Sequence, residues 1–462
     1  MAKHRLAVFL LFFFIFSVFS FFSLFVPPAS AYYTNMDADV VIGQPDFTSG
    51  SANQGGTAGA STINQPTGVA YDASSKKLIV SDFNNHRILI YNQVPTSNNA
   101  PADVVIGQTN FTSTSANQGG GVNANTLSFP FHIAVVGGRL IVADGSNNRV
   151  LIYNSIPSSN NTSADVVVGQ ADFTSNGQNQ GQGTSSAAAN TLRFPRGVYS
   201  DGTKLFISDG GNSRVLIYNS IPTSNNVSAD IVVGQPDFTS RAANQGGTAA
   251  ANTLSNSDGD VIVINNKLVV ADHVNHRVLI FNQIPTTNNV SADVVLGQVN
   301  FSTVDSTGTT GANSTRRPID LVSDGTRLFI ATNFSSRVIV HNSIPTVNTV
   351  AHDISIGQPN LTDNTQRTTA NGMWGPVGLA LAEKKLIVAD NTNNRILIFN
   401  NIISTPIIGL YPFPESAGNG RLRMRGNVRL GEWGRYSLSN SKMEVSVNRG
   451  GYGAVSSLYG NR

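Results

Sequence analysis

One motif recurs six times along the 462-residue chain and constrains the fold more than any other feature of the sequence. The motif is ADVVIGQPDFTS with small changes, and its first aspartate falls at Asp39, Asp103, Asp165, Asp230, Asp293 and Asp353. Successive copies are 60 to 65 residues apart. Internal periods of this size are typical of propellers and other repeat architectures, in which each copy forms one structural unit.

Between these copies runs a second constant unit that predicts three further strands. In the first copy it consists of GVAYD, KLIVSD and RILIYN. Each stretch alternates or is rich in β-branched residues, and each is bounded by Gly, Asn or Asp, as strands are. No segment shows the apolar spacing of a helix. Four strands per repeat of ~60 residues, six times over, predict an all-β fold that is a six-bladed propeller.

The order of the two units predicts how the ring closes. ADVVIGQ stands before the first triplet of strands, and no seventh copy follows the sixth triplet, which ends at residue 400. Residues 38–44 should therefore form the outer strand of the blade whose three inner strands come from 377–400. This arrangement leaves only short sheet edges exposed. We place the propeller at 38–405 and expect it to be monomeric.

Residues 1–31 predict a targeting segment. A basic head at 3–5 precedes an apolar run over 6–26, and the tripeptide Ala-Ser-Ala at 29–31 has the pattern of a signal peptidase site. We therefore expect a secreted or cell-envelope protein. Because the apolar run has 21 residues, an uncleaved signal anchor is the alternative, and membrane attachment is expected only in that case.

Charge and cysteine content exclude several classes of protein. Residues 32–408 contain 20 basic and 24 acidic residues, so a nucleic acid partner is not expected for the body of the chain. The segment 409–462 carries 8 basic and 3 acidic residues and predicts a basic tail or a partial β module. The absence of cysteine excludes a disulfide scaffold and a cysteine-ligated zinc site.

The inner-strand unit LIVADxxNNRVLIYN, present in nearly every copy, resembles the NHL repeat family of β-propellers, of the kind found in secreted bacterial-type proteins. The resemblance covers roughly 38–405. It implies a six-bladed propeller that serves as an interaction domain or sensor. Some six-bladed relatives are metal-dependent lyases or lactonases that work at the central channel. The repeats here are longer than a minimal NHL repeat, because each contains an additional segment of the type PDFTSxxANQGGTxxANTL.

Residues that recur at the same place in each blade are expected to be structural. An aspartate precedes an arginine by five positions in five blades, whereas blade five has Thr332 before Arg337. We interpret the pair as a turn anchor, with an intervening asparagine such as Asn85 in the left-handed conformation. A recurring aromatic after the outer strand should pin the long loop onto its blade. These aromatic positions are Phe47, Phe111, Phe173, Phe238 and Phe301, with Leu361 in the last copy.

The position at the start of the inner strand differs between blades, and this difference predicts a site. Three blades have Gly68, Gly197 or Gly378 there, and the other three have His132, Asp260 and Asp320, while Arg196 stands one position before Gly197. Inner strands line the channel, so His132, Arg196, Asp260 and Asp320 should converge at its mouth, with His132 across the ring from Asp320. The four residues are our candidate ligand-binding set.

The sequence leaves two interpretations of this site open. Asp260 and Asp320, with His132, could hold calcium, magnesium or zinc, because carboxylate and imidazole groups are ligands for these cations. The alternative is a hydrated polar channel, or carboxylates paired with Arg196. The remaining histidines are expected on the surface or in turns. These are His86, His273, His276, His341 and His352.

The long loops and the Asp-x-x-Asn-x-Arg turns should lie on one face, around the channel mouth. Their amide and hydroxyl groups suit a glycan or a protein surface, although such loops are also simply well solvated. The sequence contains no nucleophile elbow, P-loop or dinucleotide fingerprint, and we assign no catalytic residue. We predict an exported, non-enzymatic binding or scaffolding propeller; the alternative is a metal-dependent lyase or lactonase-like hydrolase with its site at the channel.

Overall fold

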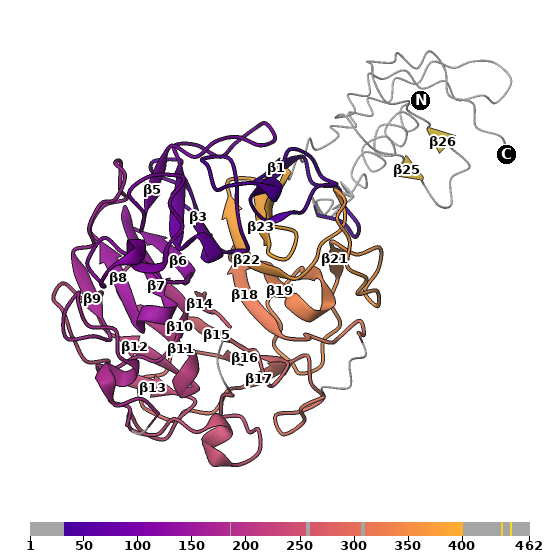
Figure 1. The fold of residues 1–462 in the computed structure, drawn as a ribbon. Helices are drawn as coiled ribbons and strands as arrows, with labels where there is room; N and C mark the ends of the chain where they lie inside the picture. Colours follow the sequence, from indigo (N-terminus) through magenta and orange to yellow (C-terminus); the bar gives the residue numbers. More distant parts are fainter. Residues whose placement is uncertain are drawn as a thin grey trace, which may run out of the picture. The chain divides into compact units, whose positions relative to one another are not determined.

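The computed structural model describes residues 32–184, 186–255, 259–305 and 310–400, together with two short strands in the tail. Six four-stranded antiparallel sheets are arranged in a ring (Figure 1). The inner strands contact one another in sequence order around the ring, and the last, β22, contacts the first, β2. The predicted six-bladed propeller is confirmed.

Each blade consists of four strands that follow one another from the channel outwards. Blade one contains β2 (Pro66–Tyr71), β3 (Leu78–Asp82), β4 (Arg87–Tyr91) and β5 (Val104–Ile106). Blade two contains β6 (Pro130–Val136), β7 (Arg139–Asp144), β8 (Arg149–Tyr153) and β9 (Val166–Val168). Blade three contains β10 (Pro195–Ser200), β11 (Leu205–Asp209), β12 (Arg214–Tyr218) and β13 (Ile231–Val233).

The second half of the ring repeats this order. Blade four contains β14 (Val261–Ile264), β15 (Lys267–Asp272), β16 (Arg277–Phe281) and β17 (Val294–Leu296). Blade five contains β18 (Pro318–Ser323), β19 (Leu328–Thr332), β20 (Arg337–His341) and β21 (Ile354–Ile356). Blade six contains β22 (Pro376–Ala382), β23 (Lys385–Asp390), β24 (Arg395–Asn400) and β1 (Val40–Ile42).

Short 3₁₀ helices occur in the long loops and in the turns between the middle strands. Those in the loops are η1 (Ala52–Gly55), η3 (Ala116–Gly119), η5 (Gln178–Gly181) and η7 (Ala243–Gly246). Those in the turns are η2 (Phe83–Asn85), η4 (Gly145–Asn147), η6 (Gly210–Asn212) and η8 (Asn333–Ser335). No helix in the described part of the chain is long and apolar enough to span a membrane.

The core lies between neighbouring blades. Ile79 and Ile88 of blade one, for example, pack with Leu140 and Val142 of blade two, and all four are buried. A middle strand is covered on both faces by the adjacent blades, so its sequence is a continuous apolar run rather than a simple alternation. Burying such side chains is the main favourable contribution to the stability of the ring.

Blade six is completed by the N-terminal strand. β1 pairs antiparallel with β24, with Val41 opposite Leu397, and the two segments lie side by side in Figure 1. This is the pairing that the order of the repeats predicts. Tyr32 and Met36, which precede β1, are also buried in the core.

The outer strand of each blade is capped by the next blade along the ring. The side-chain oxygen of Asn98 in blade one accepts a hydrogen bond of 3.0 Å from the amide of Val41 in blade six, and the amide of Asn99 donates to the Val41 carbonyl. Asn160, Asn225, Asn288 and Asn348 act in the same way in the following blades. The asparagine side chains therefore satisfy backbone groups at sheet edges that would otherwise be open.

Two predicted segments lie largely outside the described residues. Nothing is described of residues 1–31, the predicted targeting segment. In the tail, β25 (Tyr436–Ser437) pairs antiparallel with β26 (Glu444–Val445), and the rest of 409–462 lies outside the described part.

Candidate functional site

The recurring arginine is a structural anchor in every blade. In blade one, Arg87 is completely buried and its Nε donates to Asp82 Oδ2 at 2.7 Å. Its other guanidinium nitrogens donate to the carbonyls of Gly59 and Thr62, in the loop before the blade, and of Phe111, in the loop after it. One guanidinium thus joins a turn to two loops. The same ion pair, at 2.7–2.8 Å, occurs in all blades except the fifth.

The asparagine of the turn has a different role from the one predicted. The left-handed residue is not Asn85 but the next residue, His86, with φ of 53°. Asn85 instead donates to Asp82 Oδ2 at 2.8 Å and exchanges hydrogen bonds with Asn53 of the long loop. The long loops and these turns therefore meet on one face, which we call the loop-rich face.

The recurring aromatic residue pins its loop in two ways. Its carbonyl accepts a hydrogen bond from the anchor arginine, as Phe173 does from Arg149 at 2.7 Å, and its ring packs against the core. Leu361 offers the same carbonyl to Arg337. The carbonyl contact explains why the position need not be aromatic in the last copy.

Blade five contains the same buried arginine without its acid. Thr332 occupies the place of the aspartate, and its hydroxyl donates to the carbonyl of Arg337 at 3.0 Å. Arg337 Nε has no hydrogen-bond partner in the described part of the chain. Burial lowers the pKa of Arg337 to about 10. Blade five therefore holds a buried arginine without a carboxylate partner among its described residues, whereas each of the other blades has an aspartate that neutralises its arginine.

Thr332→Asp is expected to stabilise the protein, because it would supply the missing carboxylate to Arg337. Hydrogen bonds to charged groups contribute about 1.5–3 kcal/mol, so a rise in the free energy of unfolding of about 1–2 kcal/mol is expected in urea titrations. Thr332→Asn, which has a similar shape and no charge, is the control. An aspartate variant no more stable than the asparagine variant would contradict the assignment.

Three of the four predicted site residues form a compact group in the channel. His132 lies on β6, Asp260 directly before β14 and Asp320 on β18. His132 Nδ1 is 3.6 Å from Asp260 Oδ1, and His132 Nε2 is 3.4 Å from Asp320 Oδ2. Both carboxylates are buried, each residue being 2% exposed. We call these three residues the channel cluster.

Backbone groups of neighbouring blades hold the channel cluster in place. His132 Nδ1 donates to the Val198 carbonyl at 3.2 Å. Asp320 accepts hydrogen bonds of 2.6 Å from the amides of Leu321 and Leu379. His132 Nε2 and Asp260 Oδ1 have no hydrogen-bond partner among the described residues. The cluster therefore joins five blades and leaves two buried polar atoms facing into it.

The glycines at the equivalent positions make room for their neighbours. A Cβ on Gly197 would lie 2.8 Å from both the Cα and Oδ1 of Asp260. A Cβ on Gly378 would lie 2.2 Å from the Thr67 carbonyl. The inner strands approach too closely at these two points for any side chain, so packing requires the glycines there.

The two carboxylates keep His132 protonated at neutral pH. Burial acts to lower the pKa of His132, but the charges of Asp260 and Asp320 outweigh it and raise the pKa to about 9. Burial also raises the pKa of Asp260 well above its usual range, an effect that His132 opposes and Asp320 reinforces. The channel cluster therefore holds an imidazolium between two buried carboxyl groups.

Arg196, the fourth predicted residue, lies next to an aromatic ring. Its guanidinium carbon is 4.6 Å from the centre of the Phe131 ring, a cation–π geometry. Phe131 directly precedes His132, so this contact belongs to the same part of the channel mouth.

The prediction that the other histidines lie at the surface or in turns holds in part: His86, His273 and His276 are in turns, but these three and the strand-associated His341 and His352 are all buried. His86 and His276 are in turns, but they are 8% exposed and accept hydrogen bonds from the amides of Phe129 and Arg317. His341 and His352 form a buried pair, with His341 Nε2 2.9 Å from His352 Nδ1. Burial lowers their pKa values to about 4 and about 3. In blade one the same two positions are Tyr91 and Ala102, so a paired replacement in the sequence marked this contact.

Most amides of the loop-rich face are used inside the loops. Gln54 Nε2 donates to the Ser61 carbonyl at 3.0 Å and to Asn99 Oδ1 at 2.7 Å, and Gln118, Gln180 and Gln245 repeat this pattern. Gln44 Nε2 binds the carbonyls of Ser51 and Asn394. The repeated amides therefore shape the loops, and residues that differ between blades are the candidates for a binding site.

Two exposed aromatic residues stand at positions where the blades differ. Phe334, in the turn of blade five, is 47% exposed, and Trp374, before β22 of blade six, is 40% exposed. Most other blades have small or polar residues at these positions, among them Asn84 and Asn64 in blade one. The residues next to the two aromatics in the sequence lie close together, since a Cβ added to Gly375 would be 3.1 Å from Asn333 Nδ2. The sequence comparison that found the channel residues would have found these as well.

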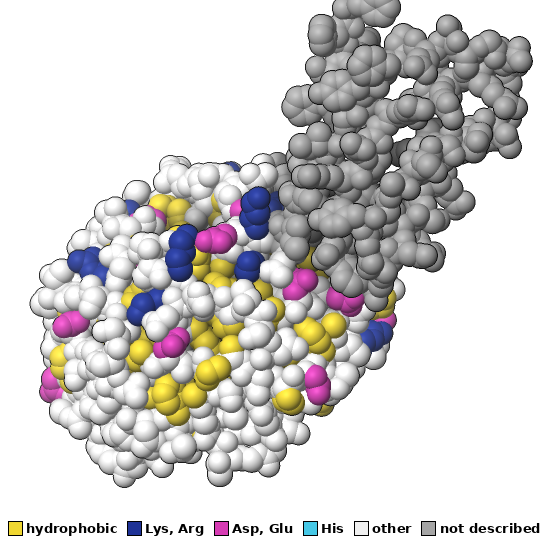
Figure 2. All heavy atoms as spheres, turned by 90° about the horizontal axis from the view of Figure 1, so that it is seen from above, with side chains coloured by type: hydrophobic (Ala, Val, Ile, Leu, Met, Phe, Trp, Pro, Cys, Tyr) yellow, Lys and Arg dark blue, Asp and Glu magenta, His cyan; other side chains and the backbone are white. Residues whose placement is uncertain are grey.

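The side of the molecule drawn in Figure 2 carries few charged side chains. In the view of Figure 2, most of the surface of the ring is uncharged and polar, with isolated Lys, Arg, Asp and Glu side chains between apolar areas. Arg317 lies over the Phe334 ring at 4.1 Å and leaves the ring half exposed.

Comparison with known proteins gives a family match to part of one blade and distant similarity to several solved structures. The NHL repeat family matches residues 64–91, which are β2 to β4 of blade one. No curated protein matches the chain. Among solved structures, the nidogen/laminin complex has 14% identity, covers 64% of this chain and 85% of its own, and gives a TM-score of 0.37.

Two further structures are similarly distant. BamB from Moraxella catarrhalis has 13% identity, with 73% of this chain and 86% of its own covered and a TM-score of 0.35. Virginiamycin B lyase from Staphylococcus aureus has 9% identity, with 74% and 97% covered and a TM-score of 0.35. The three strands that match the family recur in each of the other five blades. The chain is a six-bladed β-propeller, and β2 to β4 of its first blade match the NHL repeat family.

Proposed function

We propose that this protein is an exported, monomeric and non-enzymatic binding propeller whose loop-rich face takes a glycan. The observation that carries the proposal is the pair of exposed aromatic rings, Phe334 and Trp374, on a face made mostly of polar loops. A flat aromatic ring can cover the C–H face of a sugar while neighbouring amide and hydroxyl groups bind its hydroxyls. A protein partner is the other outcome of the test.

The start of the folded chain supports export. Tyr32 follows the predicted cleavage site after residue 31 directly, and it is 2% exposed. Its ring packs edge-on against Phe329 at 5.2 Å, and the Arg327 guanidinium lies over it. The predicted cleavage site therefore lies directly before a residue that is part of the propeller core.

Trp374→Ala and Phe334→Ala are each expected to weaken glycan binding about tenfold or more, because aromatic contacts of this kind contribute about 1 kcal/mol or more beyond the area they bury. Binding of the purified protein to cellulose, chitin, xylan and peptidoglycan is measured by depletion assays and calorimetry. Val347→Ala is the control, since Val347 is 62% exposed and lies in the connection between β20 and β21.

Two results would overturn the glycan proposal. One is that none of these polysaccharides binds. The other is that Val347→Ala weakens binding as much as the two aromatic variants do.

A metal-dependent lyase or lactonase is the second candidate, and the channel cluster is what supports it. One ligand atom from each of His132, Asp260 and Asp320 lies within 4.8 Å of the others. Against it, His132 Nδ1 already binds a carbonyl, both Asp320 oxygens accept backbone hydrogen bonds, and both acids are buried.

Calorimetry with calcium, magnesium and zinc distinguishes the two candidates. We expect the same heats for the unaltered protein and for Asp260→Ala/Asp320→Ala. Stoichiometric binding that the double variant abolishes, together with metal-dependent lactone hydrolysis, would establish the enzyme instead.

A further inference from the structure

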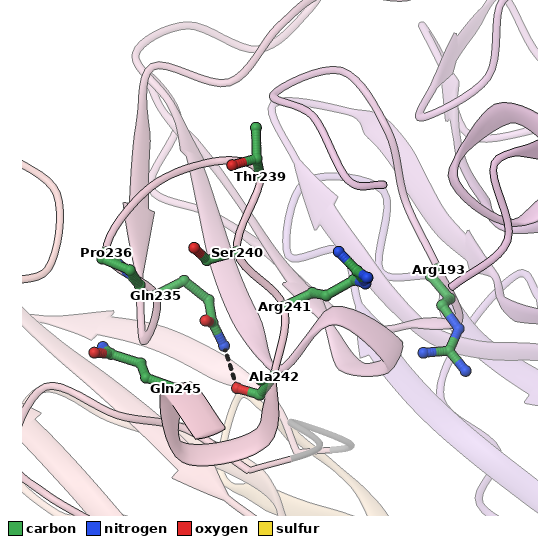
Figure 3. Close-up of a pocket in the computed structure, with 8 residues that line it drawn as sticks. All are labelled: Arg193, Gln235, Pro236, Thr239, Ser240, Arg241, Ala242 and Gln245. Carbon is green, nitrogen blue, oxygen red and sulfur yellow. Dashed lines mark hydrogen bonds between the residues drawn. The ribbon is translucent and has the colours of Figure 1, made fainter. Parts of the chain in front are cut away.

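A pocket of about 480 Å³ lies on the loop-rich face beside blade three. It is formed by the loop after β13 and by the residue that leads towards β10. The polar side chains around it are Arg193, Gln235, Thr239, Ser240, Arg241 and Gln245 (Figure 3). Two arginines and no acidic residue line this pocket.

The two guanidinium groups differ in how they are held. Arg193 is positioned by hydrogen bonds from Nε to Gln178 Oε1 at 3.2 Å and from Nη1 to the Gly211 carbonyl at 2.7 Å. Figure 3 shows the Arg241 side chain extending towards Arg193. Within the described ranges, Arg241 makes no hydrogen bond or ion pair. One cation is thus fixed and the other is available to close on a ligand.

The nearest acid in the sequence is already satisfied by its own turn. Asp237 accepts hydrogen bonds from the Thr239 amide and hydroxyl, at 2.8 and 2.7 Å, and from the Ser240 amide at 2.8 Å. These bonds lower its pKa to about 2. Asp237 is not among the pocket-lining residues, so its carboxylate does not neutralise the two arginines there.

No other junction between blades has this pair of cations. Arg241 corresponds to Gly50, Thr114 and Asn176 in the first three loops, and the residues that correspond to Arg193 beside them are Trp374, Asn64 and Ser128. Because the repeats are otherwise so similar, the pair is a local departure and not a requirement of the fold.

We infer that this pocket is a subsite for an acidic sugar, whose carboxylate or sulfate group lies between Arg193 and Arg241. Guanidinium groups bind such anions through paired, charge-assisted hydrogen bonds. The hydroxyls of Thr239 and Ser240 line the rest of the pocket and suit sugar hydroxyls. This inference rests on the proposed glycan function and names the class of glycan.

The experiment titrates the full protein with trigalacturonate, with a chondroitin sulfate oligosaccharide and with a neutral oligosaccharide of equal length. We expect the protein to prefer an acidic probe, and to lose about tenfold or more of that affinity in Arg241→Gln. Affinity for the acidic probe should also fall as salt is raised. Which acidic probe binds distinguishes a carboxylate from a sulfate ester.

Arg139→Gln is the matched control, because it removes the same charge from the β6–β7 hairpin, outside the pocket. Arg241→Lys keeps the charge but not the paired geometry and should retain only part of the affinity. Equal affinity for the acidic and neutral probes, or equal losses in Arg241→Gln and Arg139→Gln, would refute the subsite.

Failure of the subsite and failure of the proposed function give different results. If neutral glycans bind through Trp374 while Arg241→Gln has no effect, the subsite is refuted and the glycan function stands. If the acidic probe depends on Arg241 while Trp374→Ala has no effect, the aromatic surface is refuted and the subsite stands.

Discussion

Asp144→Ala is expected to lower the free energy of unfolding by about 3–5 kcal/mol, the range measured when one partner of a buried ion pair is removed. Asp144 and Arg149 are both completely buried, with Arg149 Nε 2.8 Å from Asp144 Oδ2. The substitution also removes the acceptor for Asn147 and for the Ser128 amide. Urea unfolding followed by fluorescence measures the change.

A double substitution separates the ion pair from general damage to the turn. In Asp144→Ala/Arg149→Met no buried charge is left, so part of the lost stability should return. Thr332→Ala is the second control, because blade five already lacks the acid, and its cost should be close to the ~1 kcal/mol of one ordinary hydrogen bond. If Asp144→Ala costs no more than Thr332→Ala, the arginine anchor is not a main source of stability.

The fold could be predicted because the repeat supplies six independent copies of one pattern. A single KLIVAD segment is compatible with several sheet architectures, but six copies with the same spacing specify blades. The position of ADVVIGQ before the first triplet then placed residues 38–44 next to β24. The pairing of β1 with β24, which are far apart in the sequence, followed here from counting the copies of the two repeat units.

Contacts made by side chains in the turns could not be predicted from the pattern alone. The sequence shows that Asn85 and His86 lie between Asp82 and Arg87, but not which of them takes the left-handed conformation. That depends on the bond between Asn85 and Asn53, 32 positions away. Burial of the histidines was missed for the same reason, since it depends on loops from the neighbouring blade.

The sequence predicts where the channel cluster lies, but it does not predict the protonation state of its residues. Aligning the blades brought His132, Asp260 and Asp320 together and placed His132 across the ring from Asp320. Their protonation depends on burial and on distances of 3.4 and 3.6 Å, which no spacing encodes.

His132→Gln is expected to destabilise the protein at pH 6 and to have little effect at pH 10. The pKa of His132 is about 9 in the folded chain, against about 6.5 for an unperturbed histidine. Because the folded-state pKa is the higher one, the contribution is complete below about pH 6.5 and is lost as pH rises through about 9. This difference between the folded-state and unperturbed pKa of His132 corresponds to roughly 3 kcal/mol of folding free energy.

The pH profile of the difference between the two proteins is the decisive measurement, since all other titrating groups are shared. Glutamine keeps a polar side chain of similar size but leaves Asp260 and Asp320 without a cation between them. In His132→Gln/Asp260→Asn only one acid remains, so much of the loss at pH 6 should be recovered. A difference that stays constant from pH 6 to pH 10 would show that His132 is neutral in the channel. A difference that disappears when the unaltered protein is treated with a chelator would show that a bound cation, and not a proton, joins the two carboxylates.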